Sequence, residues 1–137
     1  MPDEVVVDAS VAAKVFITEV GSDAARSLAS SGIRMLAPDL IFVELANVAV
    51  KRMRRGDISR DMAADLVASA PGLLNEVVPA TDLTARAFAL ACDHGISTYD
   101  AMYVALAEVR GCQLITADLR LIAKASEAGL AVELKQP

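Results

Sequence analysis

The chain has 137 residues, of which 55% are hydrophobic, and its formal net charge is −5. This size and composition predict one domain over residues 1–137 that buries a core without disulfides or a structural metal. The acidic balance argues against a nucleic-acid binder that relies on a basic surface alone. No apolar stretch approaches the about 20 residues of a membrane span. The chain starts with acids rather than a signal sequence, so we expect a cytoplasmic protein with no membrane partner.

Five apolar segments rich in β-branched residues alternate with segments rich in helix formers. The apolar segments are predicted to be short buried strands at residues 4–8, 33–37, 76–80, 112–116 and 130–134. Because strand and helix alternate, the sequence predicts an α/β fold. In that fold, helices flank a central, mainly parallel sheet of four to five strands.

The helices between the strands are marked by caps and glycines. The clearest are predicted over residues 39–56, 59–72, 83–95, 97–111 and 118–128. Pro38 and Asp39 suit the first turn of the first of these helices. Ser59 can cap the second, and Ser97 or Thr98 can cap the fourth.

Two residue types that often carry chemistry have plainer interpretations here. Cys92 and Cys112 lie in apolar segments without C-x-x-C spacing, so we expect reduced thiols in or near the core. The single histidine, His94, precedes Gly95 at a predicted helix end, so we interpret it as a capping or surface residue.

Two acids follow predicted strands directly. Asp8 ends the first strand, and Asp118 lies two residues past Thr116, where the fourth strand ends. Ligands of open parallel sheets gather beyond the carboxyl ends of the strands, so both acids are candidates for a site. A helix-capping role explains Asp118 equally well.

Two further acids lie on helix faces that are otherwise apolar. Glu44 shares its face with Leu40, Ile41 and Val48, and a buried carboxylate needs a partner or a metal ion. Pairing with Lys51 or reaching out to solvent would also explain Glu44. Asp100 lies in the first turn of its helix, where the helix dipole alone is sufficient to stabilise it.

One shared explanation accounts for these acids better than four separate ones. If Asp8, Glu44, Asp100 and Asp118 converge, they form an all-oxygen cluster that suits Mg²⁺ or Mn²⁺. Without metal, neighbouring carboxylates repel one another, and the pKa of at least one should rise.

The order of these motifs resembles PIN-domain proteins of the VapC toxin group. The resemblance rests on "VVVDAS", "PDLIFVELANV", "STYDAMYVALAE" and "LITAD", and it extends from Asp8 to Glu133. It implies a PIN-like three-layer α/β/α fold and metal-dependent hydrolysis of RNA. It also implies a homodimer and a VapB-type antitoxin as partner.

By this resemblance, Asp8, Glu44, Asp100 and Asp118 are the catalytic, metal-binding set. Ser10 and Thr116 match small hydroxyl positions beside the first and last acids, and Asn47 matches an asparagine one turn after the glutamate. An acid that the family often has a few residues past "TAD" is absent here, where Leu119, Arg120, Leu121 and Ile122 follow.

The basic run at the end of the helix that carries Glu44 is a candidate RNA track, formed by Lys51, Arg52, Arg54 and Arg55. A solvated helix terminus is the alternative for this run. Tyr99 and Tyr103 are candidates for stacking on bases. A second hypothesis for the whole chain is a PIN fold that mainly binds a partner and has weak or no nuclease activity.

Three other parallel α/β classes fit less well. A receiver domain needs an acid at the end of the third strand, and a haloacid-dehalogenase-type phosphatase needs one where Ser10 stands. A nucleotide binder needs a glycine-rich turn after the first strand, and "DASVAA" has none.

Overall fold

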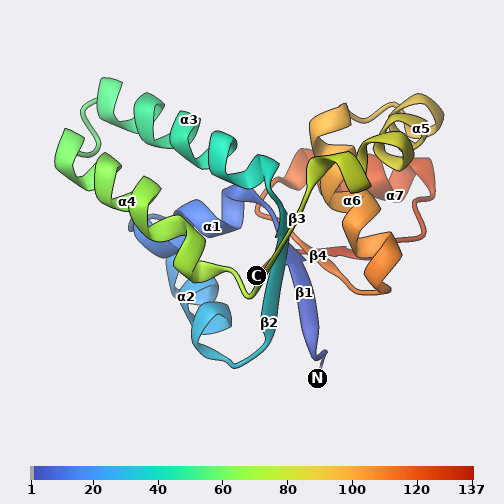
Figure 1. The fold of residues 1–137 in the computed structure, drawn as a ribbon, viewed down its shortest axis with the longest axis horizontal. Helices are drawn as coiled ribbons and strands as arrows, with labels where there is room; N and C mark the ends of the chain where they lie inside the picture. Colours follow the sequence, from blue (N-terminus) through green and yellow to red (C-terminus); the bar gives the residue numbers. More distant parts are fainter. Residues whose placement is uncertain (1) are drawn as a thin grey trace.

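A computed structural model describes residues 2–137 of the chain (Figure 1). Within this range the elements follow in the order β1 (Glu4–Val7), α1 (Ala9–Phe16), α2 (Ser22–Ser30), β2 (Arg34–Pro38), α3 (Leu40–Arg54), α4 (Arg60–Leu73), β3 (Glu76–Val78), the 3-10 turn η1 (Ala80–Asp82), α5 (Thr84–His94), α6 (Thr98–Arg110), β4 (Leu114–Ile115), α7 (Leu119–Ala128) and β5 (Leu134–Lys135). None of the described helices is long and apolar enough to cross a membrane.

The strands form one sheet in the order β3-β2-β1-β4-β5, and every neighbouring pair is parallel. β1 lies at the centre, where Val6 is in register with Leu36 of β2 and Leu114 of β4. Parallel neighbours need long crossover connections, and the helices between the strands provide them. The predicted α/β class with a parallel central sheet is confirmed.

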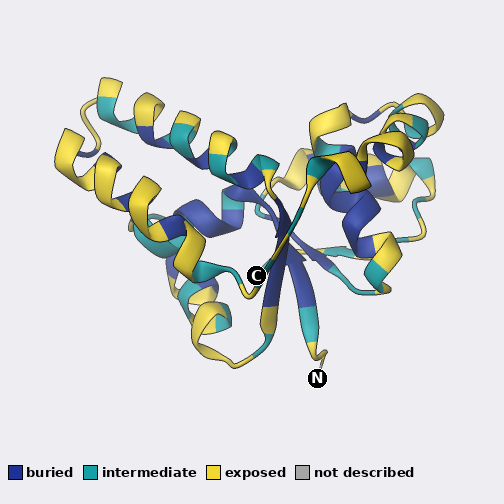
Figure 2. Ribbon diagram, in the orientation of Figure 1, coloured by how far each residue is buried: buried dark blue, intermediate teal, exposed yellow. Residues whose placement is uncertain are grey.

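The side chains of β1 alternate between the two faces of the sheet, because successive residues of a strand point to opposite sides. Val5 and Val7 pack with Val11 of α1 and Ala25 of α2. Val6 faces the larger core, to which α3, α4, α5, α6 and α7 contribute. Figure 2 shows strands buried between helices whose outer faces are exposed. Burying each of these valines contributes about 1.5–3 kcal/mol.

Several strand boundaries differ from those expected: β3 ends at Val78 rather than at 80, and β4 covers Leu114–Ile115 rather than 112–116. Pro38, expected in a first helical turn, is the last residue of β2 and lies in register with Val78. The ladder tolerates its missing N–H, because the next N–H, of Asp39, donates to the Val78 carbonyl at 2.9 Å. The strand expected over 130–134 is the shorter β5, because residues 130–133 are needed to return the chain from α7 to the sheet edge.

The predicted caps are confirmed, and one of the two cysteine predictions is wrong. Ser59 and Ser97 accept hydrogen bonds from backbone N–H groups in the first turns of α4 and α6. Cys112 is half-buried and packs against the larger core, as expected. Cys92 is exposed. It lies two positions from the buried Leu90, and two positions turn a side chain by about 200° around a helix.

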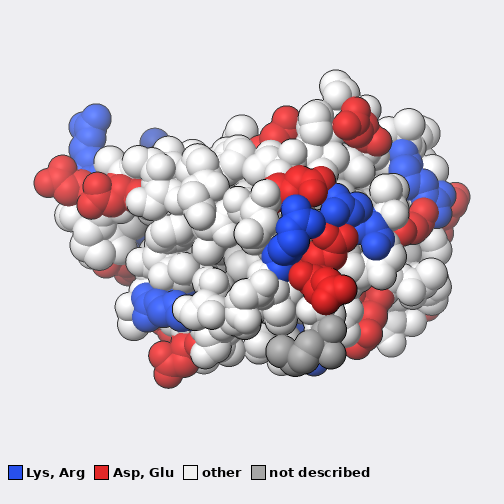
Figure 3. Space-filling model, turned by 60° about the horizontal axis from the view of Figure 1, so that its bottom comes forward, with Lys and Arg blue, Asp and Glu red and all other residues white. Residues whose placement is uncertain are grey.

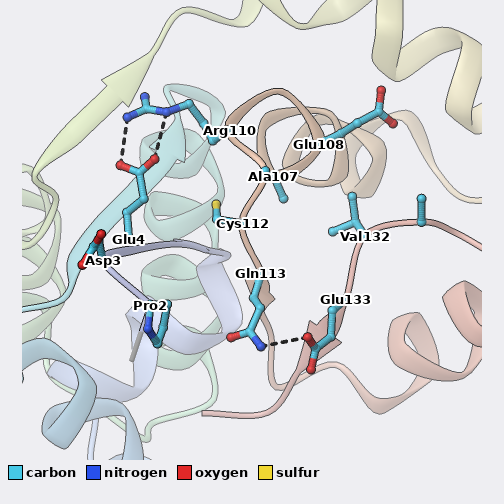
Figure 4. A pocket seen from close by; sticks show the side chains of 12 residues that line it. Pro2, Asp3, Glu4, Ala107, Glu108, Arg110, Cys112, Gln113, Val132 and Glu133 are labelled. Carbon is cyan, nitrogen blue, oxygen red and sulfur yellow. Dashed lines mark hydrogen bonds and ion pairs between the residues drawn. The ribbon is translucent and has the colours of Figure 1, made fainter.

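At the edge where the strands begin, four charged side chains pair with one another. Arg110 contacts Glu4 at 2.9 Å and Glu76 at 2.5 Å, and Arg34 contacts the same two acids at 3.0 and 3.2 Å. Figure 3 shows basic and acidic side chains gathered on this side. A pocket of about 900 Å³ opens beside them, with Arg110 and Glu4 on its wall (Figure 4). We call Glu4, Arg34, Glu76 and Arg110 the basal ion pairs.

Candidate functional site

Asp8 lies where β1 ends and α1 begins, at the carboxyl edge of the sheet. The residue is buried, and it caps α1 by accepting a hydrogen bond from Val11 N at 3.2 Å. The hydroxyls of Ser10 and Thr116 each donate to its carboxylate at 2.5 Å. Burial raises the pKa of Asp8 and the charge of Asp100 adds to this, while the three hydrogen bonds act in the opposite direction. The carboxylate is held in place by these donors, and it forms no ion pair within residues 2–137.

Ser10 and Thr116 connect Asp8 to the chain that follows β4. Thr116 Oγ1 accepts a hydrogen bond from Asp118 N at 3.0 Å, and Ser10 Oγ accepts one from Ala117 N at 2.9 Å. Each hydroxyl therefore accepts from the turn after β4 and donates to Asp8. The two hydroxyl oxygens are 3.4 Å apart. This geometry depends on the parallel pairing of β1 with β4, which brings their carboxyl ends together.

Glu44 lies on α3 and is half-buried against α6. The hydroxyl of Tyr103 donates a hydrogen bond to Glu44 Oε1 at 2.5 Å. Burial raises the pKa of Glu44, this hydrogen bond lowers it, and the charges of Asp8 and Asp100 raise it further. The alternative pairing with Lys51 is not observed, since Lys51 forms no ion pair within residues 2–137.

Tyr103 has a role that the sequence did not reveal. Only 2% of it is exposed, so its ring is not available to stack on a base, whereas Tyr99 is 64% exposed. Asn47, expected to orient Glu44 or a ligand, is exposed and forms no hydrogen bond to Glu44 within the described part of the chain. The available signal was a tyrosine inside the apolar run "MYVALA", because a buried tyrosine hydroxyl needs a partner.

Asp100 and Asp118 bring two further carboxylates to this edge. Burial raises the pKa of Asp100 and the charge of Asp118 adds to this, while Ser97 and Lys124 act in the opposite direction. Asp118 is exposed and caps α7 by accepting hydrogen bonds from two backbone N–H groups at 3.0 and 3.2 Å. The capping role that the sequence left open for Asp118 is therefore observed.

We call Asp8, Glu44, Asp100 and Asp118 the edge acids. The pKa values of the first three are all raised, as expected from their mutual repulsion, although burial is the larger cause. Within residues 2–137, no group of three or more Asp, Glu, His or Cys side chains is arranged so that it could hold a metal ion. Asp8, Glu44 and Asp118 are instead turned toward hydrogen-bond donors of the protein itself.

The donor chemistry of the edge acids fits a hard divalent cation. Oxygen ligands suit Mg²⁺ and Mn²⁺, whereas zinc and copper favour thiolate and imidazole. Mg²⁺ commonly binds through one or two carboxylates and keeps several waters, so a closed cage of protein ligands is not required. Burial and neighbouring acids raise the pKa values of Asp8, Glu44 and Asp100, and a bound cation would act in the opposite direction.

A hollow of about 410 Å³ extends from the edge acids along α3. Among the residues that line it are Ser10, Asp118, Lys51, Arg52 and Arg55. Three of the four predicted RNA-track residues therefore face one space with two residues of the site. Arg54 is exposed but does not line the hollow. Arg52 and Arg55 both pair with Asp57, at 3.6 and 2.8 Å, so part of their charge is compensated.

Lys14 and Glu19 line the same hollow and were not found from the sequence. Lys14 donates to Glu19 at 3.2 Å, and Arg52 pairs with the other oxygen of the same carboxylate. Partial burial acts to raise the pKa of Glu19, but these hydrogen bonds hold it below its ordinary value. The hollow therefore carries less positive charge than its lysines and arginines alone suggest.

His94 contacts the end of α7. Its Nδ1 is 3.2 Å from the carbonyl oxygen of Ala128, at the end of α7. The residue ends α5 and is half-buried. The interpretation as a capping or surface residue agrees with this contact.

Comparison with known proteins places this arrangement in a family. The sequence model of the PIN domain matches residues 5–127. Ribonuclease VapC3 from Pyrobaculum aerophilum is 36% identical over 123 residues, which cover 88% of this chain and 94% of that protein. The crystal structure of PAE2754 from Pyrobaculum aerophilum aligns with a TM-score of 0.73 and 22% identity, over 96% of this chain and 83% of that one. DNA-bound VapBC from Salmonella typhimurium aligns with a TM-score of 0.66 and 18% identity, over 99% and 98% of the two chains. Both solved structures share the fold.

Proposed function

The chain belongs to the PIN-domain family, and on that premise we propose that it is a metal-dependent endoribonuclease, the toxin of a VapBC-type toxin–antitoxin system. The observation that carries the proposal is the setting of Asp8, Glu44 and Asp100. Burial raises the pKa of all three at one edge of the sheet, and their charges reinforce one another. Acids perturbed in this way concentrate at functional sites.

The edge acids would hold Mg²⁺ or Mn²⁺, because their oxygen ligands match these ions. When bound, such an ion activates water as a nucleophile and neutralises charge on the phosphoryl group. The protein's own part is orientation: Ser10 and Thr116 fix the Asp8 carboxylate, and Tyr103 fixes that of Glu44. No nucleophilic side chain is required by this chemistry.

The hollow along α3 supports an RNA backbone track at Lys51, Arg52, Arg54 and Arg55. Phosphate contacts need clustered lysine and arginine, and Lys51, Arg52 and Arg55 share their space with Asp118. Arg54 follows on the same exposed helix end. An RNA substrate also supports the expectation that the chain acts in the cytoplasm.

A VapB-type antitoxin is the proposed protein partner, supported by the fold shared with the VapBC complex. A basic side chain of such a partner would satisfy the edge acids in place of the metal ion. We also propose a homodimer and a single working domain over residues 1–137. Exposed apolar side chains, such as Val43 at 70% and Phe88 at 64%, support a further protein contact.

A second candidate function is a PIN fold that mainly binds a partner, with weak or no nuclease activity. The observation that favours it is the spacing of the acids, since no three of them within residues 2–137 are arranged to hold an ion. Metal affinity and RNA cleavage distinguish the two candidates.

The test is cleavage of total cellular RNA by the purified, partner-free protein in Mn²⁺, in Mg²⁺ and in chelator. Asp100→Asn is the matched control, because it removes one charge and keeps the side-chain shape. We expect metal-dependent cuts that are lost in the control, and sequencing the fragment ends would identify the target. Metal binding without cuts would support the partner-binding candidate, and no metal binding would refute the assignment of the edge acids.

A further inference from the structure

A second hollow, of about 460 Å³, begins at the edge acids and follows α7. Asp100, Asp118, Arg120, Lys124 and Glu127 are among its lining residues. Asp118 also lines the hollow along α3, so the two spaces meet at this residue. In Figure 1, α3 extends to one side of the sheet and α7 lies on the other. The edge acids are therefore approached from two directions.

We propose that Arg120 and Lys124 form a second phosphate-binding surface, which holds single-stranded RNA on the side of the edge acids opposite α3. We call these two residues the α7 surface. This proposal rests on the proposed ribonuclease function, because the α7 surface would bind the same RNA that the edge acids would cut. The basic run on α3 would contact that RNA on one side of the edge acids, and the α7 surface would contact it on the other.

Both residues of the α7 surface present charge that the protein leaves available. They are four positions apart, so they lie on the same side of α7, and both are exposed. Arg120 forms no ion pair within residues 2–137. Lys124 donates to the carbonyl oxygen of Gly95 at 2.9 Å, which is a neutral partner. Lys124 lines the same hollow as Asp100.

The acids in this hollow do not cancel the α7 surface once the site is loaded. Asp100 and Asp118 belong to the set that would hold a divalent cation, so their charge is then compensated. Glu127 remains, one acid against the two cations Arg120 and Lys124. The hollow along α3 is partly compensated as well, because Glu19 pairs with both Lys14 and Arg52.

A cut within a chain requires that nucleotides extend from the scissile phosphate in both directions. One basic hollow accounts for one direction only. Two hollows of this size, which is typical of small-ligand sites, hold about one or two nucleotides each. Their meeting at Asp118 gives a path for RNA past Asp100 and Asp118, with cations at both ends.

The test measures RNA binding directly, so that it does not depend on cleavage. The probe is a fluorescent, unstructured RNA of about 12 nucleotides, a length typical of single-strand binding sites. Its dissociation constant is measured at several salt concentrations, with Mg²⁺ present throughout, in an Asp100→Asn background. The variants are Arg120→Ala, Arg120→Ala with Lys124→Ala, and Lys51→Ala. Arg60→Ala is the matched control, since Arg60 is exposed on α4 and lines neither hollow.

We expect Arg120→Ala to weaken binding about threefold to tenfold and to reduce the slope of log affinity against log salt by about 0.7. The double α7 variant should reduce this slope by about twice as much. Lys51→Ala should reduce the slope by an amount that does not depend on the α7 residues. Arg60→Ala should match the background protein. If the α7 variants also match it, or if no RNA binds, the α7 surface is wrong.

A second measurement tests the two directions. Photoreactive uridine is placed at one end of the probe or at the other, and the crosslinked peptides are identified by mass spectrometry. We expect one end to label α7 and the other to label α3. Both ends labelling the same helix would overturn the arrangement. Weakened binding by the α7 variants, together with no RNA cleavage by the protein that keeps Asp100, would support the surface and refute the nuclease. RNA cleavage by Arg120→Ala and Lys124→Ala proteins that keep Asp100, with unchanged binding, would refute the surface alone.

Discussion

The two edges of the sheet place carboxylates in opposite electrostatic settings. Among the basal ion pairs, hydrogen bonds from Arg110 and Arg34 hold the pKa of Glu76 below its ordinary value. At the carboxyl edge, burial and neighbouring acids raise the pKa of Asp8, Glu44 and Asp100. The same chemical group is satisfied at one edge and left short of positive charge at the other.

This difference shows where carboxylates stabilise the fold and where they destabilise it. A carboxylate that is paired in the native state favours folding, while a desolvated one without a cation opposes it. A ligand that binds only the native state returns stability to the protein. The basal ion pairs therefore stabilise the fold. The edge acids lower its stability and favour the binding of a cation.

The largest effect is expected from Asp100→Asn. RNA cleavage should fall about a hundredfold or more, because a group that we propose to hold the metal ion is lost. In chelator the same variant should melt about 3 °C higher, because a buried, repelled charge is removed. Asp65→Asn, an exposed acid on α4, is the control and should change neither quantity. A lower melting temperature of Asp100→Asn in chelator would contradict the comparison of the two edges.

A smaller effect is expected from Tyr103→Phe, which removes only the hydroxyl that donates to Glu44. One lost hydrogen bond to a charged group corresponds to about tenfold weaker Mn²⁺ binding. Isothermal titration calorimetry measures this affinity, and Tyr99→Phe, on an exposed tyrosine of the same helix, is the control. Equal affinities for the two variants would show that Glu44 does not depend on Tyr103.

A still smaller effect is expected at the basal ion pairs. Arg110→Met leaves Glu4 and Glu76 with Arg34 alone and should lower the melting temperature by about 2 °C, because such pairs are partly exposed to water. Arg86→Met, which breaks one exposed pair with Glu108, should lower it less. RNA cleavage should be unchanged in both. Loss of cleavage by folded Arg110→Met would show that the two edges are coupled.

The smallest effect concerns how Glu76 and Asp100 contribute to the free energy of unfolding as the pH changes. The two contributions should change with pH in opposite directions, which melting experiments in chelator measure. The folded pKa of Glu76 lies below its unfolded value of 4.5, so its contribution is present above pH 4.5 and is lost as the pH falls. The folded pKa of Asp100 lies above its unfolded value of 3.8, so its contribution is present below pH 3.8 and is lost as the pH rises.

The destabilisation caused by Glu76→Gln should therefore shrink as the pH falls below 4.5. The stabilisation caused by Asp100→Asn should grow as the pH rises above 3.8. The same pH trend in both variants would contradict the assignment of opposite settings.

What the sequence predicted well depends on neighbours along the chain. Ser59 and Ser97 cap helices whose first turns they precede, and a cap needs no distant partner. Asp8 and Asp118 could be placed at the same edge because parallel strands must end on the same side.

What the sequence did not predict depends on partners that are far along the chain. The Tyr103 hydroxyl meets Glu44 across 59 positions, and Arg52 meets Glu19 across 33. No local pattern selects one acid over another as the partner at such separations. Pro38 was misplaced for a similar reason, because only its pairing with β3 shows that β2 continues to it.

The position of β1 at the centre of the sheet has a consequence for synthesis. Asp8 leaves the ribosome well before its hydroxyl donor Thr116, which lies 108 positions later in the chain. Until the chain after β4 has emerged, the first acid has neither this donor nor its neighbour Asp118. An incomplete chain therefore carries only some of the edge acids and their hydrogen-bond donors. We expect RNA cleavage to begin only late in translation.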